Sequence, residues 1–112
     1  MEESKNINVA EEDLFAMCAN KSASEIKEMR ENGASDDVIR QAVRYYLNRR
    51  LADGKIECMI CLEESAWVEE IEMDETEGLI SCYVEYEGWY DIDDLSTDCL
   101  LQIVDGLEDS SN

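Results

Sequence analysis

Two cysteines separated by two residues are the first feature of this sequence that could support chemistry. Cys58 and Cys61 have the spacing of a zinc-binding or redox pair, and Cys82 and Cys99 follow far enough along the chain to complete a four-cysteine zinc site. The pair lies in a segment that alternates like a β-strand, in which residues three apart face opposite sides. We therefore expect small buried thiols rather than a zinc or redox site, and no cofactor.

The other reactive side chains give no catalytic arrangement. The chain has no histidine for a nucleophile–base triad and no glycine-rich loop for phosphate. The segment Asp91-Ile92-Asp93-Asp94 resembles the start of a calcium loop, but the glycine and glutamate that complete such a loop are missing. Paired carboxylates hydrolyse glycosides from a concave pocket, whereas these acids fall on predicted solvent-facing positions. The sequence therefore predicts a protein that is not an enzyme.

The charge of the chain is large and unevenly placed. Of 112 residues, 29 are Asp or Glu and 9 are Lys or Arg, which gives a net charge of −20. Every cation lies at or before Lys55, so residues 56–112 contain 18 acids and no base. This charge exceeds what solubility needs, and it costs stability because like charges repel in the compact state. It also opposes direct binding to nucleic acid or to an anionic membrane, since both attract Lys and Arg.

Residues 1–54 have the pattern of a helical half. Apolar residues recur at helical spacing and predict three helices, at about 8–19, 22–32 and 36–52. A capping residue precedes the apolar positions of each helix: Asn8, Ser22 and Ser35. These helices carry six of the nine Lys and Arg residues of the chain.

The third predicted helix has Arg40 and Arg44 one turn apart on the same face. Such a pair suits a helix-turn-helix contact with DNA, but the field of the whole chain repels a phosphate backbone. We expect these cations to offset neighbouring acids and the helix C-terminus instead. A contact in a homodimer, or with an acidic partner, stays open for this face.

Residues 55–108 change period after Gly54 and predict a sheet followed by a helix. Alternating segments predict an antiparallel four-stranded meander, at about 55–62, 67–74, 79–87 and 89–93. A two-residue loop, Glu87-Gly88, would join the last two strands. A final helix over about 96–107, capped by Ser96, would cover the inner face of the sheet. The predicted fold class is α+β, in a single compact domain over residues 1–112.

Alternation also assigns a face to each strand residue. Trp67, Ile71 and Met73 are predicted to point inward from the second strand, and Tyr86 from the third. Acidic and aromatic residues occupy the outward positions, where they would repeat every ~6.6–6.8 Å along each strand. The candidate partner-binding residues are these outward residues and the acids beside them: Glu70, Glu72, Asp74, Glu75, Glu77, Tyr83, Glu85, Glu87, Trp89, Asp91, Asp93 and Asp94.

In size, charge, lack of histidine and lack of a catalytic arrangement, the chain resembles the acidic DNA-mimic inhibitors of phages and mobile elements, in the anti-restriction and anti-CRISPR classes. The resemblance rests on these properties rather than on a motif, so no family residue is transferred to this chain. It implies a protein that occupies the nucleic-acid channel of a basic partner, such as a Cas effector or a restriction enzyme.

Two other functions stay open at this point. The chain could be an immunity protein or antitoxin for a basic nuclease toxin. It could also be a small structural or zinc-stabilised adaptor whose acids only solubilise it. An odd number of cysteines and the lack of an export signal or membrane-spanning apolar run lead us to expect a cytoplasmic protein with no membrane partner.

Overall fold

The computed structural model of the chain describes residues 16–51, 54–62, 66–74, 76 and 78–110. Its elements are, in chain order, α3 (Ala23–Glu31), α4 (Asp36–Arg50), β1 (Lys55–Cys61), β2 (Trp67–Asp74), β3 (Leu79–Val84), β4 (Gly88–Asp91), the short 3-10 helix η2 (Ile92–Asp94) and α5 (Thr97–Ser110). The predicted α+β class is confirmed. Of the first predicted helix, residues 16–18 are helical, and its earlier part lies outside the described residues.

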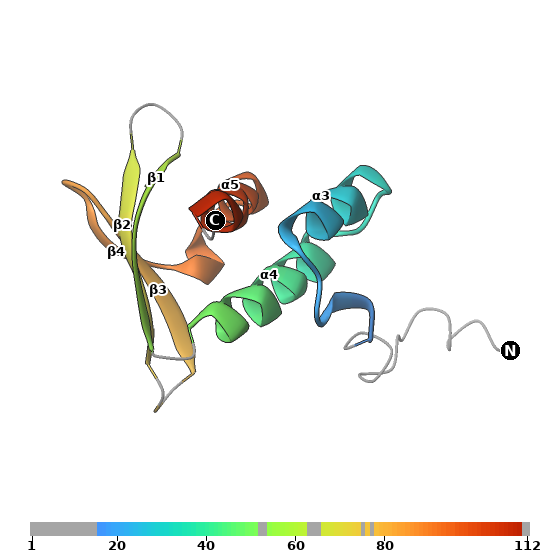
Figure 1. Cartoon of the computed structure of the whole chain (residues 1–112), viewed down its shortest axis with the longest axis horizontal. Helices are drawn as coiled ribbons and strands as arrows, with labels where there is room; N and C mark the ends of the chain where they lie inside the picture. The colour runs from blue at the N-terminus through green and yellow to red at the C-terminus, as the bar shows by residue number, and fades with distance from the viewer. Residues whose placement is uncertain (1–15, 52–53, 63–65, 75, 77, 111–112) are drawn as a thin grey trace, which may run out of the picture.

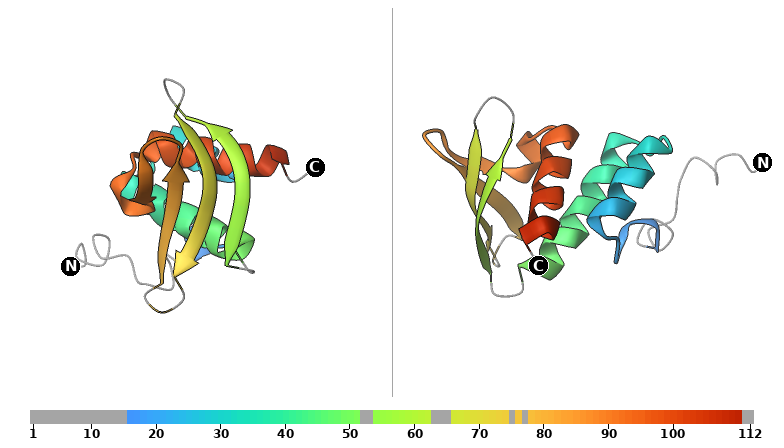
Figure 2. Two further views of the ribbon diagram at one scale, coloured as in Figure 1. Left: turned by 90° about the vertical axis from the view of Figure 1, so that its left-hand side faces the viewer. Right: turned by 45° about the horizontal axis from the view of Figure 1, so that its top comes forward.

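The elements form a sheet on one side of the molecule and helices on the other (Figure 1). The strands pair antiparallel in the order β1-β2-β3-β4, and α5 packs against the inner face of the sheet, as predicted. Helices α3 and α4 contact α5 on its side away from the sheet. The left panel of Figure 2 views the sheet from outside, and no described element lies in front of it. The outer face of the sheet is therefore uncovered within the described part of the chain.

The described helices begin at the serines that the sequence predicts as caps. Ser22 Oγ accepts a hydrogen bond from the Glu25 N–H at 3.2 Å, and the Glu25 carboxylate accepts one from the Ser22 N–H at 2.8 Å. This reciprocal capping box satisfies two N–H groups that have no partner inside α3. The hydroxyls of Ser35 and Ser96 accept hydrogen bonds from backbone N–H groups at the starts of α4 and α5.

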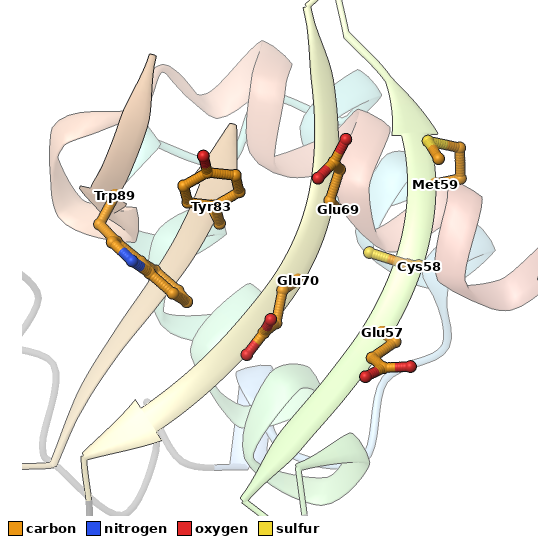
Figure 3. Close-up of a pocket in the computed structure, with 7 residues that line it drawn as sticks. All are labelled: Glu57, Cys58, Met59, Glu69, Glu70, Tyr83 and Trp89. Carbon is orange, nitrogen blue, oxygen red and sulfur yellow. The ribbon is translucent and has the colours of Figure 1, made fainter. Parts of the chain in front are cut away.

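An extra residue in β2 changes the face of part of that strand. The register between β2 and β3 shifts between Val68 and Glu70, which is a β-bulge. The bulge buries both Val68 and Ile71, which strict alternation cannot do for residues three apart. Glu69 and Glu70 then both lie on the outer face (Figure 3). Trp67, on the far side of the bulge, also falls on the outer side, so its predicted inward orientation is wrong.

The turn between β3 and β4 also differs from the prediction. β3 ends at Val84, and the turn occupies residues 85–87 instead of Glu87-Gly88. The Glu87 N–H donates to the Val84 carbonyl at 2.9 Å, and Gly88 already pairs with Val84 as the first residue of β4. Tyr86 lies in the turn at φ 70° and is 94% exposed, so its predicted inward position is wrong.

The end of β4 is set by a side-chain hydrogen bond. The Asp91 carboxylate accepts a hydrogen bond from the Asp93 N–H at 2.8 Å, and the chain turns into η2 instead of continuing as a strand. Ile92 becomes buried in the core at this turn. Asp93 and Asp94 therefore leave the sheet, and the prediction that Asp93 extends its outer face is wrong.

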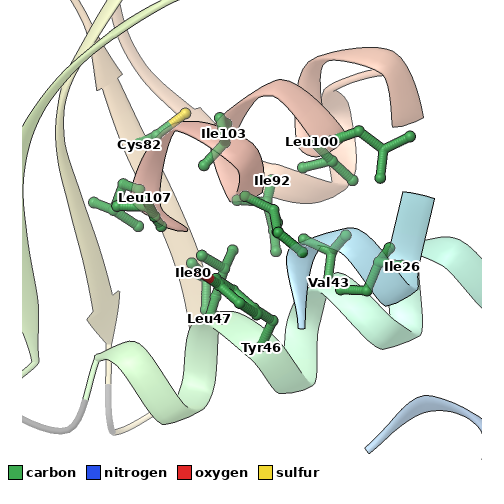
Figure 4. Close-up of a cluster of buried hydrophobic side chains, with 14 of the residues drawn as sticks. Ile26, Val43, Tyr46, Leu47, Ile80, Cys82, Ile92, Leu100, Ile103 and Leu107 are labelled. Carbon is green, nitrogen blue, oxygen red and sulfur yellow. The ribbon is translucent and has the colours of Figure 1, made fainter. Parts of the chain in front are cut away.

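The buried side chains form one cluster between the sheet and the helices (Figure 4). Ile80 from β3, Leu107 from α5 and Leu47 from α4 all belong to it. At Gly106 the helix α5 lies close to β1, because a Cβ there would lie 2.9 Å from Ile60 Cγ1. The inner face of the sheet is thus filled by α5, which leaves the polar residues of each strand on the outer face.

Candidate functional site

One row of residues crosses all four strands on the outer face of the sheet. The register pairs Glu57 with Glu70, Glu70 with Tyr83, and Tyr83 with Trp89. Directly paired residues share a face, so two carboxylates on β1 and β2 lie beside two aromatic rings on β3 and β4 (Figure 3). Both aromatic residues therefore lie on the face that the sequence predicts for them.

A second row runs beside the first, through Lys55, Glu72, Ser81 and Asp91. Asp74, at the end of β2, is exposed on the same face and accepts a hydrogen bond from the Thr76 N–H at 2.9 Å. Glu85 follows Val84 of β3, and its N–H donates to the Trp67 carbonyl at 2.9 Å. We define the acidic face as the following nine residues: Glu57, Glu69, Glu70, Glu72, Asp74, Tyr83, Glu85, Trp89 and Asp91.

The first row bounds an open groove of about 510 Å³ on this face. Its walls are formed by residues of all four strands: Glu57, Cys58, Met59, Glu69, Glu70, Tyr83 and Trp89. The rings of Tyr83 and Trp89 meet edge to face, with centroids 5.4 Å apart and planes at 62°. Trp89 is 50% exposed, which leaves much of its surface available to a partner. Half-exposed aromatic residues of this kind are typical anchors of protein interfaces.

The carboxylates on this face are crowded. A hydrogen bond with Glu70 raises the pKa of Glu72, and partial desolvation and the negative charge of Glu70 act in the same direction. Lys55 Nζ lies 3.8 Å from a carboxylate oxygen of both Glu57 and Glu70 and offsets part of this charge. No Lys or Arg follows Lys55 in the sequence. The face therefore holds more negative charge than its own cation can neutralise.

The arginines of the helices are used to hold η2 and α5. Arg44 pairs with Asp93 at 2.6 Å, which ties η2 to α4 and removes Asp93 from the candidate site. Other contacts of this kind join Lys27 to Asp105, Arg30 to Asp98, Arg40 to the Ile92 carbonyl and Arg50 to the Leu107 carbonyl. The cations named here thus contact the helical side of the molecule, away from the acidic face.

The remaining candidate residues lie at the margins. Glu87 accepts a hydrogen bond from the Tyr90 hydroxyl at 2.8 Å, which raises the pKa of Tyr90 and holds the carboxylate next to the β3–β4 turn. Asp94 is exposed in η2. Glu75 and Glu77 lie outside the described residues. The structure therefore gathers part of the predicted site and separates Asp93 and Asp94 from it.

Two acids of the groove were not among the predicted site residues. Glu57 is outward by simple alternation in β1, but only the pairing of β1 with β2 shows that it lies beside Glu70. Glu69 lies on the outer face because of the bulge in β2. Two consecutive glutamates in a strand do not indicate a bulge, so the sequence could not predict this position. Met59, which is 63% exposed, also lines the groove.

The cysteines do not converge on a metal site. Cys58 is half-buried and packs against the core, although it also lines the groove, whereas Cys61 is exposed. Burial raises the pKa of the Cys58 and Cys82 thiols to about 11, which keeps both protonated at neutral pH. Among the described residues, no three His, Cys, Asp or Glu side chains are grouped so that they could hold a metal ion.

Comparisons with protein-family models, with curated proteins and with solved structures found no match to this chain. Within the described residues, none of the helices has both the length and the apolar character that a membrane span requires.

Proposed function

We propose that this protein is a non-catalytic acidic inhibitor that acts as a DNA mimic. Its acidic face would occupy the positively charged nucleic-acid-binding groove of a partner protein, in the manner of anti-restriction or anti-CRISPR inhibitors. The observation that carries the proposal is the row through Glu57, Glu70, Tyr83 and Trp89 on an uncovered sheet face. This row combines fixed negative charge with aromatic anchors.

The spacing of the acidic face supports this function. Outward residues on one strand are ~6.6–6.8 Å apart, and neighbouring strands are ~4.8 Å apart. The carboxylates of β1, β2 and β4 therefore form an array at strand spacing on the sheet, to which the bulge in β2 adds Glu69 beside Glu70. Duplex DNA likewise presents closely spaced charges, one per ~1.7 Å of its axis. Lys and Arg side chains placed to bind phosphates can pair with such carboxylates and release counterions in the same way.

The crowding of carboxylates on the acidic face also supports the proposed function. The pKa of Glu72 is raised first by its hydrogen bond with Glu70, then by partial desolvation and by the negative charge of Glu70. A basic partner would relieve the part that comes from this charge. A surface kept only for solubility has no need of this repulsion. The helical half, by contrast, uses contacts such as Arg44–Asp93 to offset its charges internally.

The test compares two variants with the same change in charge. The face variant replaces four carboxylates of the acidic face with glutamine: Glu57, Glu70, Glu72 and Glu85. The control variant replaces four carboxylates of the helices with their amides: Glu28, Glu31, Asp37 and Asp109. The wild-type protein is used to capture its partner from a host lysate at low salt, and the purified partner is then bound to labelled duplex DNA.

We expect wild-type protein and the control variant to displace the DNA, and the face variant to do so much more weakly. Exposed charge pairs contribute about 0.5 kcal/mol each, so losing four should weaken binding by about 2 kcal/mol, or about thirtyfold in Kd. Equal competition by the face variant would refute the proposal. The identity of the captured protein distinguishes a Cas effector or restriction enzyme from a nuclease toxin, for which this chain would be the immunity protein.

A further inference from the structure

We infer that the groove on the acidic face binds an arginine side chain of the partner, held between carboxylates at one end and aromatic rings at the other. This inference rests on the proposed function and specifies which basic residue the site selects. The groove is the part of the acidic face where charge and aromatic surface lie together, over all four strands (Figure 3).

The two ends of the groove differ in chemistry. Glu57 and Glu70 lie on β1 and β2, and Glu69 is added beside them by the bulge. Tyr83 and Trp89 lie at the other end of the same row. Tyr83 is on β3, one strand from Glu70, and Trp89 is on β4, the next strand. Adjacent strands are ~4.8 Å apart, so a group that contacts Glu70 is also within reach of the Tyr83 ring.

A guanidinium group matches both ends at once. Its planar fork donates two parallel hydrogen bonds to a carboxylate, and its flat face stacks on aromatic rings. Trp89 offers such a ring, since it is 50% exposed and meets Tyr83 edge to face. A lysine ammonium is a compact and strongly hydrated charge that gains less from stacking, so the aromatic end favours arginine.

Charge excludes the other flat ligands that aromatic residues commonly bind. A nucleobase brings a phosphate with it, and the three glutamates of the groove would repel that phosphate. Lys55 does not block an incoming cation, because its Nζ is 3.8 Å from both Glu57 and Glu70 and half exposed. Exposed pairs of this length contribute little, so a guanidinium can replace Lys55 at these carboxylates.

The experiment uses fluorescently labelled oligo-arginine and oligo-lysine peptides of equal length, with binding measured by anisotropy at low salt. The wild-type protein is compared with Trp89→Leu, which keeps apolar bulk but removes the aromatic face. Tyr86→Leu is the matched control, because Tyr86 is 94% exposed in the β3–β4 turn and does not line the groove. Circular dichroism confirms that each variant is folded.

We expect the wild-type protein to bind oligo-arginine about two- to fivefold more tightly than oligo-lysine, the range for an exposed cation–aromatic contact. Trp89→Leu should abolish this preference, while Tyr86→Leu should keep it. Equal affinity of the wild type for the two peptides, or a preference that survives in Trp89→Leu, would overturn the inference.

The same peptides separate this inference from the proposed function. The Gln face variant should bind both peptides more weakly than wild type if the acidic face is the docking surface. Unchanged binding of both peptides by that variant would count against the proposed function itself. Weaker binding without any preference for arginine would count against the arginine site alone.

Discussion

Replacing Gly106 with alanine should destabilise this protein, although the same change stabilises most helices. In a helix interior, alanine is favoured over glycine by about 0.8–1.0 kcal/mol. In α5, however, the new Cβ would lie 2.9 and 3.0 Å from Cγ1 and Cγ2 of Ile60. Those atoms belong to a stiff β-branched side chain that is only 6% exposed, so they have little room to move. Overpacking of this kind costs about 1–3 kcal/mol.

The net effect of Gly106→Ala should be a loss of about 0–2 kcal/mol in the free energy of unfolding. Removing most of the Ile60 side chain should turn this loss into a gain. Ile60→Ala alone should cost about 2–5 kcal/mol, because it leaves a cavity under α5. It also removes the three atoms that would lie nearest to the new Cβ at Gly106, which are Cγ1, Cγ2 and Cδ1 of Ile60. In that background, Gly106→Ala should stabilise the protein by about 1 kcal/mol.

Equilibrium urea unfolding of the four proteins, followed by circular dichroism, measures this cycle. The expected coupling between the two sites is about 1–3 kcal/mol. If Gly106→Ala stabilises both backgrounds equally, α5 lies farther from β1 than the structure places it. The inner face of the sheet would then be less firmly covered, and the rigid support of the acidic face would be in doubt.

Three further outcomes test the charges and thiols. Glu72→Gln should raise the free energy of unfolding at pH 7 because the folded state raises the pKa of this carboxyl. In urea titrations the gain should shrink as the pH falls through the raised pKa of the folded state, and it should be lost below pH ~4, where the carboxyl becomes protonated in both states. Exposed Cys61 should react quickly with a thiol reagent in the native protein, whereas Cys82, with its pKa of about 11, should react only after unfolding. The melting temperature should rise with added salt as the screening length falls to ~10 Å near 0.1 M; a flat calorimetric response would contradict the proposed repulsion.

Local signals in the sequence were sufficient to predict most of the elements. The serines that begin α3, α4 and α5 make their capping hydrogen bonds with residues three positions later, so no distant contact is needed to recognise them. The alternation in β1 and β3 likewise reports burial directly, because one side of each strand packs on α5. These are the parts of the fold in which local preference and tertiary packing agree.

The predictions that are wrong concern positions where distant or competing interactions determine the local structure. The bulge in β2 arises because Val68 and Ile71 are both buried against the helices, which depends on the whole core. The early end of β4 arises because the Asp91 side chain competes with the strand for the Asp93 N–H. Arg44 then pairs with Asp93 across 49 positions, which alternation within a strand cannot reveal.

The composition of the candidate site depends on register. Glu57 belongs to the groove because β1 pairs with β2 so that it lies opposite Glu70. Each strand predicts its own outward residues, but the row through Tyr83 and Trp89 exists only once all three pairings are fixed. The sequence therefore indicated an acidic surface, whereas the structure supplies the groove within it.

The most direct test of the central proposal is a map of the surface that binds the basic partner. Isotope-labelled protein is mixed with the captured partner at low salt, and backbone amide chemical shifts are recorded by nuclear magnetic resonance. We expect the largest changes to fall on outward residues of the sheet, with Glu70, Tyr83 and Trp89 among them. Changes confined to α3 and α4, with the sheet unaffected, would contradict it.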